Sequence, residues 1–150
     1  MALAIATCTC KTCGKTFEYR ATKYNRREAD SFVAWAVDHI DTCPDCKKAA
    51  AAAQRAADNA AAAADSAARN WPALTGSEKQ IAWATTIRKE IIDKFASKMR
   101  PEYLDLYNTC AAELMAEKTA ASWWIDMRYD TMAVFAAIND KAKAHVTANN

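Results

Sequence analysis

The sequence is poor in the residues that make tight turns. Its 150 residues include only two glycines and three prolines, whereas alanine is abundant. Alanine has the highest helix propensity, and sandwiches or barrels need many short strands joined by turns. The composition therefore disfavours those β architectures, and we predict a mainly α-helical fold.

Long apolar runs and a strong charge of either sign are also missing. The apolar segment 1–6 has no basic leader and is too short for a signal peptide or a membrane span. We therefore expect an intracellular protein of the cytoplasm that does not associate with a membrane. Basic and acidic residues number 20 and 18, and the slight basic excess falls within the first 48 residues. Such an excess does not by itself predict a nucleic-acid binder.

Side chains suited to catalysis are few. There are two histidines, His39 and His145, and the second lies in a polar tail. No nucleophile and base stand at the spacing of a hydrolytic or transfer centre. Asp126 and Asp130 could share a cation, but acidic residues near a helix start are explained by the helix dipole. We predict that the protein is not an enzyme.

Cysteine, in contrast, is well represented. Four of the six cysteines form two CxxC pairs, Cys10 with Cys13 and Cys43 with Cys46. Two such pairs can place four thiolates at the corners of a tetrahedron, which zinc prefers in structural sites. Disulfides are the alternative, but CxxC pairs without a secretory signal more often bind metal. We predict one structural zinc ion per chain, in a closed site that has no position for a substrate.

Two other residues near the CxxC pairs could take part in a mixed metal site. Cys8 forms a CxC with Cys10, and His39 precedes Cys43 by one helical turn. The CxxC spacing lets two thiolates converge from one tight turn, and it favours the four-cysteine set over any set with Cys8 or His39.

The first domain that we predict is a zinc module of residues 1–48. Gly14 suits the turn after the first cysteine pair, and Lys15–Ala21 alternates like one strand of a short hairpin. Asn25 followed by Glu28 is typical of a helix start, and an apolar stripe continues behind it. The module is therefore expected to be a hairpin and a helix joined by zinc.

Two helical regions follow the zinc module. Residues 49–70 are predicted to belong to one alanine-rich helix, either packed in a bundle or partly exposed as a rod, with disorder as the competing interpretation. Residues 71–150 are predicted to form a three- to four-helix bundle. Its helices are expected to begin after Thr75 or Ser77, at Pro101 and at Ser122.

The five tryptophans divide into two groups. Trp83 and Trp124 fall on apolar stripes and are predicted core residues. Trp35, Trp71 and Trp123 lie off the stripes or at junctions, as expected for an interface. The candidate surface for a partner or a nucleic acid comprises Lys15, Arg20, Lys23, Arg26, Arg27, Trp35, Trp71 and Trp123.

Two segments resemble small proteins of phages and other bacterial mobile elements. Leu74–Arg88 contains the pattern GSxKQIxWAxxIR, and Ser122–Arg128 contains the pattern WWIDxR. The cysteine module before them resembles a treble-clef or zinc-ribbon knuckle. The resemblance implies a protein that acts in a bacterial host cell, where such small proteins commonly bind host machinery.

These observations lead to two functional hypotheses. The first is a non-enzymatic, zinc-containing interaction protein that binds a host protein or nucleoprotein complex. Under this hypothesis the protein could inhibit a host defence complex. The alternative is a DNA- or RNA-binding protein that uses the basic residues of the zinc module. The sequence does not indicate an oligomeric state.

Overall fold

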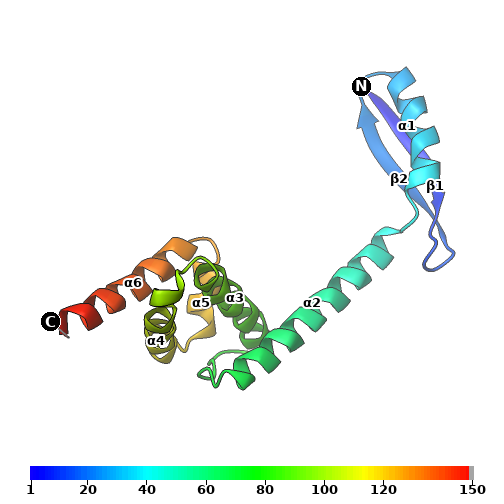
Figure 1. The fold of residues 1–150 in the computed structure, drawn as a ribbon. Helices are drawn as coiled ribbons and strands as arrows, with labels where there is room; N and C mark the ends of the chain where they lie inside the picture. Colours follow the sequence, from blue (N-terminus) through cyan, green and yellow to red (C-terminus); the bar gives the residue numbers. More distant parts are fainter. Residues whose placement is uncertain (149–150) are drawn as a thin grey trace. The chain divides into compact units, whose positions relative to one another are not determined.

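The computed structural model describes residues 1–148, which divide into two compact units, Met1–Arg55 and the chain from Ala56 onward. It confirms a mainly helical fold with a small hairpin at the N-terminus (Figure 1). The elements in chain order are β1 (Ala2–Thr9), β2 (Thr16–Lys23), α1 (Arg26–His39), α2 (Pro44–Ala68), α3 (Glu78–Ala96), α4 (Pro101–Glu117), α5 (Ala121–Met127) and α6 (Thr131–Ala148). Within residues 1–148, no helix is both long and apolar enough to cross a membrane.

In the first unit, β1 and β2 form an antiparallel hairpin, and α1 runs along one face of it (Figure 1). Alternate residues of β1, namely Ala4, Ala6 and Cys8, are buried on that face. Because these side chains are small, the buried Ala29 and Ala36 of α1 can approach the sheet closely. The strand predicted at 15–21 corresponds to β2, whereas β1 was not predicted as a strand.

The predicted start of α1 is confirmed. The side-chain oxygen of Asn25 accepts a hydrogen bond from the backbone N–H of Glu28 at 2.9 Å. The side-chain amide of Asn25 donates to the Glu28 carboxylate at 3.3 Å, which closes the cap from both sides. One donor that the helix leaves unpaired is thereby satisfied.

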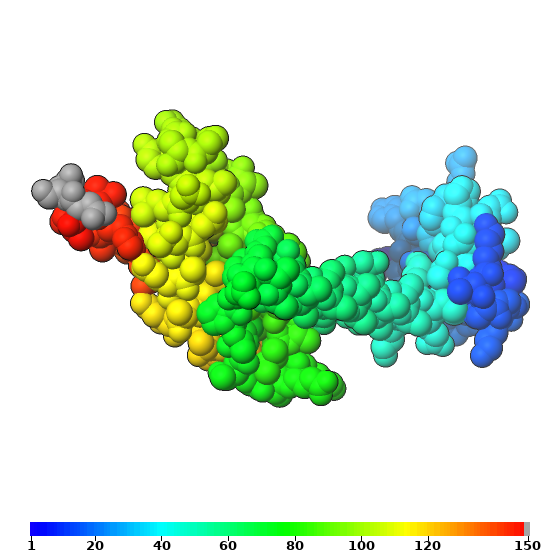
Figure 2. Space-filling model, turned by 60° about the horizontal axis from the view of Figure 1, so that its bottom comes forward, coloured from blue at the N-terminus to red at the C-terminus, as the bar shows by residue number. Residues whose placement is uncertain are grey.

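The alanine-rich helix α2 has two different halves. Every residue from Lys47 to Asp58 is exposed, and Figure 2 shows this part of the helix uncovered on the face in view. In the C-terminal half Ala62 and Ser66 are buried, and Asn59 accepts a hydrogen bond from the Thr86 hydroxyl at 2.7 Å. The N-terminal half of α2 is thus the predicted exposed rod, and the C-terminal half is the predicted packed helix. The segment is helical throughout, so the prediction of disorder is wrong.

The second unit has a core of fifteen buried residues, drawn from α3 to α6 and the segment before α3. Trp124 is fully buried, as predicted, and its indole N–H donates to the carbonyl oxygen of Lys118 at 2.7 Å. Phe95 of α3 stacks on Phe135 of α6 with 4.7 Å between ring centroids. Ser77, one of two predicted caps, starts α3 through a capping box with Gln80.

The prediction that Trp83 belongs to the core is wrong, because its side chain is 47% exposed. Four-residue steps advance about 40° around a helix beyond one full turn, so the series Trp83, Ile87, Ile91 winds slowly around α3. The face that is buried follows the 3.6-residue period instead and includes Ala84 and Arg88. Trp83 lies at the edge of that face, where Arg128 covers its ring at 4.9 Å.

The last predicted helix is two helices. α5 ends at Met127 and α6 begins at Thr131, with a turn between them. Asp130 occupies this turn, and its carboxylate accepts a hydrogen bond from the backbone N–H of Ala133 at 3.1 Å. Asp130 therefore caps α6, as the dipole interpretation predicts, whereas Asp126 lies in the last turn of α5, where that interpretation does not apply.

The two segments that resemble proteins of mobile elements lie side by side in the second unit. Thr75 donates to Thr119 at 2.8 Å and accepts from Ala121 at 2.9 Å, which joins the segment before α3 to the start of α5. Gly76 has a positive φ of 149° at this junction, and a Cβ there would lie 3.2 Å from the Cβ of Ala121. Glycine therefore permits both the backbone conformation and the close approach.

Arg88 is a buried cation that anchors the same region. It is 1% exposed, and its guanidinium donates to the Pro72 carbonyl oxygen and to the Ser66 hydroxyl, both at 2.8 Å. Within residues 1–148 no carboxylate pairs with it, and burial lowers the pKa of Arg88. Trp71, half-buried against the core, lies over the guanidinium at 5.3 Å. Arg88 thus links α3 to α2 and to the segment between them.

Candidate functional site

The structure brings the four predicted cysteine ligands together at one end of the first unit. Each Sγ atom of Cys10, Cys13, Cys43 and Cys46 lies within 4.8 Å of the other three. Cys10 and Cys13 belong to the turn between β1 and β2, whereas Cys43 and Cys46 lie at the start of α2. The cluster therefore ties the hairpin to α2.

The first turn depends on a glycine. The backbone N–H of Cys10 donates to Lys15 at 2.9 Å, and the N–H of Gly14 donates to Cys10 at 2.8 Å. Gly14 has a φ of 72°, a conformation that other residues adopt at a cost. The N–H of Lys11 donates to Asp41 at 2.7 Å and so connects this turn to the segment before Cys43.

Backbone N–H groups point at two of the sulfur atoms. Cys43 N–H donates to Sγ of Cys10 at 3.3 Å, and Cys46 N–H donates to Sγ of Cys43 at 3.4 Å. The hydrogen bond from Cys43 lowers the pKa of Cys10 to about 6, and the hydrogen bonds of the Cys46 thiol with Cys43 and Cys13 raise the pKa of Cys46 to about 12. The thiols of Cys10 and Cys46 thus ionise unequally, and a cation bound by the cluster would favour the thiolate form of its ligands.

The sulfur spacing fits a metal ion. The Sγ atoms of Cys13 and Cys43 are 3.8 Å apart, and a tetrahedron with zinc–sulfur bonds of about 2.3 Å has edges of about 3.8 Å. A disulfide needs a separation of about 2.05 Å. All six cysteines are free. The four cysteines can therefore hold a metal ion, and none of them is engaged in a disulfide.

The two residues that offered a mixed site lie elsewhere. Cys8 is buried beneath α1, where its thiol donates to the carbonyl oxygen of Ala36 at 3.5 Å. His39 is exposed, and its ring stacks on Trp35 with 4.9 Å between centroids. Cys110 is buried in the core of the second unit. Within the described residues, the only group of three or more potential ligands is the four-cysteine cluster.

A row of aromatic rings lies on the flank of α1 that faces β2. Consecutive centroids are 6.1 Å apart from Tyr19 to Phe32, 5.7 Å from Phe32 to Trp35 and 4.9 Å from Trp35 to His39. Trp35 is 49% exposed, and Tyr19 and His39 are also exposed. We call these four residues the aromatic strip. Only Trp35 was predicted as a surface residue, although the spacing of Phe32, Trp35 and His39 by three and four places them on one helix face.

Some of the predicted basic residues surround this strip. The ammonium of Lys23 lies 3.9 Å from the ring centroid of Phe32, and Lys23 and Arg27 line a shallow hollow beside that ring. Arg20 is paired with Glu18 at 2.7 Å, and Arg26 with Asp30 at 3.1 Å. Lys23 and Arg27 are therefore the basic groups nearest the strip.

The remaining predicted surface residues are placed differently. Lys15 is exposed in the segment between β1 and β2 that contains Cys10 and Cys13. Trp71 and Trp123 belong to the second unit, where both are half-buried against its core, and Trp123 packs edge-on against Trp124. Six of the eight predicted surface residues therefore belong to the first unit, and Trp71 and Trp123 belong to the second.

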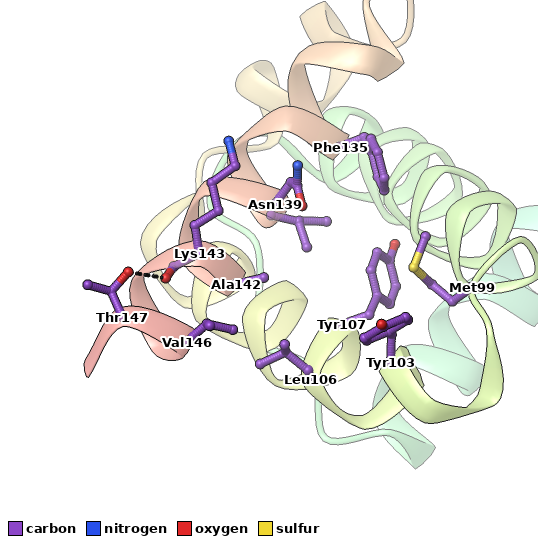
Figure 3. A pocket seen from close by; sticks show the side chains of 11 residues that line it. Met99, Tyr103, Leu106, Tyr107, Phe135, Asn139, Ala142, Lys143, Val146 and Thr147 are labelled. Carbon is purple, nitrogen blue, oxygen red and sulfur yellow. Dashed lines mark hydrogen bonds between the residues drawn. The ribbon is translucent and has the colours of Figure 1, made fainter. Parts of the chain in front are cut away.

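The second unit has an apolar groove of about 510 Å³ between α4 and α6 (Figure 3). The rings of Tyr103, Tyr107 and Phe135 line it, and the hydroxyl of Tyr107 donates to the Ile92 carbonyl oxygen at 2.9 Å. That hydrogen bond and burial, which raises the pKa of Tyr107, keep the hydroxyl neutral and committed to the fold. The groove thus offers apolar surface and little reactive chemistry.

Comparisons with known proteins do not identify this site. No family model, curated protein or solved structure matches the chain. The resemblance to proteins of mobile elements therefore stays a prediction, and the functional argument depends on the cysteine cluster and the surfaces around it.

Proposed function

We propose that the protein is a non-enzymatic interaction protein in which one structural zinc ion stabilises the first unit, and the aromatic strip binds a protein or nucleoprotein partner. The observation that carries the proposal is the continuous row of rings from Tyr19 to His39, in which Tyr19, Trp35 and His39 are exposed. It belongs to the same unit as the cysteine cluster.

The donor set supports zinc as the ion. Four thiolates are soft ligands that suit zinc, and a four-cysteine site with no open position is typical of structural zinc. Bound zinc would supply cross-linking and charge neutralisation, with no position for a substrate. The hydrogen bonds from the N–H groups of Cys43 and Cys46 would stabilise the sulfur charges that remain.

The aromatic strip has the chemistry of a binding hot spot. Tryptophan and tyrosine are enriched among residues that dominate interface affinity, because they bury large areas with little loss of side-chain freedom. In this structure Trp35 is already held between Phe32 and His39, so a partner would meet a largely ordered surface. The resemblance to mobile-element proteins supports a host complex as the partner, including a defence complex.

The matched tryptophans Trp35 and Trp83 provide the test of this surface. They are 49% and 47% exposed and belong to different units. The purified chain should recover a stoichiometric partner from bacterial lysate, Trp35→Ala should lose it, and Trp83→Ala should retain it. Equal recovery by both variants, or recovery of nucleic acid without any stoichiometric protein, would contradict the proposed partner surface.

Metal analysis tests the zinc separately. The purified protein should contain about one zinc ion per chain, and Cys43→Ser combined with Cys46→Ser should abolish it. A metal-free protein with a disulfide between the two cysteine pairs would refute this part of the proposal.

Direct binding of DNA or RNA is the second candidate function, and the position of Lys23 and Arg27 beside the strip favours it. Base stacking on Trp35 would contribute about 1–3 kcal/mol, and phosphate contacts would make the affinity fall steeply with salt. Charge reversal at Lys23 and Arg27 should then weaken the binding of a single-stranded oligonucleotide. Undetectable or salt-insensitive binding would remove this candidate.

A further inference from the structure

A second surface of the first unit has a distinct character. It is the free edge of β1, on the side of α1 opposite to the aromatic strip. The sheet has two strands only, so one edge of β1 is paired with β2 and the other has no strand beside it within the described residues. An unpaired strand edge presents a row of N–H and C=O groups to solvent.

Two hydrogen bonds show which groups face outward. The N–H of Cys10 donates to Lys15 across the hairpin, so the even-numbered residues of β1 direct their backbone groups toward β2. The N–H of the next residue, Lys11, points the other way and donates to Asp41. By this alternation, Leu3, Ile5 and Thr7 direct both N–H and C=O to the free edge.

The free edge is not protected in the usual ways. Natural edge strands are commonly protected by charged side chains, proline or a bulge. β1 contains neither a charged residue nor a proline, and its eight residues pair with β2 in unbroken register. β2, in contrast, carries Glu18, Arg20 and Lys23. The lack of protection is therefore confined to one strand.

An open hollow adjoins the free edge. It measures about 530 Å³ and lies between Leu3 to Ile5 of β1 and the helical residues Ala29, Val33 and Ala34. Its two charged residues, Arg26 and Asp30, pair with each other at 3.1 Å and leave it without net charge. On the other face of the sheet, Leu3 and Ile5 are 55% and 43% exposed.

We propose that this edge binds an extended, uncharged segment of a partner protein, which adds a third strand beside β1. Backbone groups of the segment would pair with Leu3, Ile5 and Thr7. Alternate side chains of the segment would enter the hollow beside Val33, and the others would cover Leu3 and Ile5. Because Leu3 and Ile5 are apolar and exposed and the hollow has no net charge, an uncharged segment with β-branched or other apolar residues over Leu3 and Ile5 fits this edge.

A second copy of the chain fits this edge less well. The residues of β1 beneath α1 are buried, whereas Tyr19 on β2 remains exposed, so α1 lies over β1. Two β1 strands paired antiparallel are about 4.8 Å apart and would place both copies of α1 on the same face. Packed helices need about 8–10 Å between axes, and the two helices would therefore collide.

A proline substitution separates docking at the edge from folding of the hairpin. The N–H of Thr7 faces the free edge, so Thr7→Pro removes a docking donor and keeps every hydrogen bond to β2. Thr7→Val is the matched control, because it keeps the N–H and the β-branched shape. A displayed library of random linear peptides, selected on the zinc-bound chain of 150 residues, is the probe.

We expect the selected peptides to be uncharged and apolar at alternate positions. Thr7→Pro should weaken their binding at least about tenfold, and Thr7→Val should change it by less than about twofold. Peptide binding should also slow amide hydrogen exchange at Leu3, Ile5 and Thr7, which exchange quickly in the free chain.

Three results would overturn the proposal. The first is that no peptide is selected. The second is that the selected peptides bind Thr7→Pro and the wild type equally. The third is that, without peptide, amide exchange at Leu3 and Ile5 is slow and becomes slower as the protein concentration rises. The last result would assign the edge to a second copy of the chain.

Discussion

The contiguous buried cluster of the first unit contains three small residues, Ala6, Cys8 and Ala36, whereas that of the second unit contains fifteen, among them Trp124 and Phe95. The first unit leaves the rings of Tyr19, Tyr24 and Trp35 exposed and buries Phe17 and Phe32 only partly, whereas the second unit packs most of its large side chains inside. The two units of one chain therefore differ in how much apolar area stabilises them.

The difference shows what the cysteine cluster contributes. A unit of about 55 residues with a small core buries too little apolar surface to offset the entropy of ordering its chain, and small domains of this kind commonly need a metal or disulfides. The second unit has a core of ordinary composition and no comparable need. We therefore expect the folding of the first unit, but not of the second, to depend on the metal.

The largest effect should come from a single ligand. Cys10→Ser removes one of four thiolates from a site at which the proposed zinc ion would contribute on the order of 10 kcal/mol to folding, so the first unit should unfold. Cys8→Ser changes a cysteine two residues away that donates to Ala36, and it should keep the metal. Zinc content and circular dichroism check both variants. A metal-free Cys8→Ser protein would show that Cys8 is a ligand.

The second unit should respond to loss of its core. Trp124→Ala leaves a large cavity and an unpaired carbonyl at Lys118, and should cost about 3–5 kcal/mol in the free energy of unfolding. Trp83→Ala, at a half-exposed site, should cost less than about 1 kcal/mol. Denaturant unfolding measures both, and zinc content should be unchanged in each. A similar loss in the two variants would contradict the assignment of Trp83 to the surface.

A substitution at Arg88 tests how α3 is joined to the C-terminal half of α2. Arg88→Met fills similar space but removes the hydrogen bonds to Pro72 and Ser66, and leaves two buried acceptors with no guanidinium donor. It should lower the free energy of unfolding by about 1–3 kcal/mol. Amide exchange should accelerate most between residues 66 and 74. An unchanged or higher stability would show that the burial of an unpaired charge outweighs its hydrogen bonds.

The smallest effect concerns acid. Burial raises the pKa of Asp93, but hydrogen bonds from Arg69 and Lys89 outweigh burial, and the pKa of Asp93 is lowered. The ionised form therefore stabilises the folded unit above about pH 4, and this contribution is lost as the pH falls through the lowered pKa. Since the side chain is 36% exposed, less than about 1 kcal/mol is expected. Asp93→Asn should flatten this part of the unfolding profile, and an unchanged profile would exclude Asp93 as its source.

The sequence predicts features with short-range causes well. The CxxC spacing identified the cluster, Asn25 with Glu28 identified the start of α1, and Ser77 with Gln80 that of α3. Each depends on residues a few positions apart, and the physical requirement can be read from the residue types alone.

Features that depend on tertiary contacts were missed. β1 is rich in alanine, which favours helices, and becomes a strand only because small side chains fit beneath α1. Arg88 would be expected on a surface, but carbonyl and hydroxyl acceptors from other segments satisfy it in the interior. The break between α5 and α6 has no proline or glycine to mark it.

The measurement that tests the central claim most directly is a backbone amide spectrum of the zinc-bound chain before and after addition of a strong chelator. If the metal stabilises only the first unit, the resonances of the hairpin and α1 should collapse to unfolded positions. Those of α3 to α6 should remain where they were. Unchanged spectra throughout, or the loss of both units together, would contradict the account.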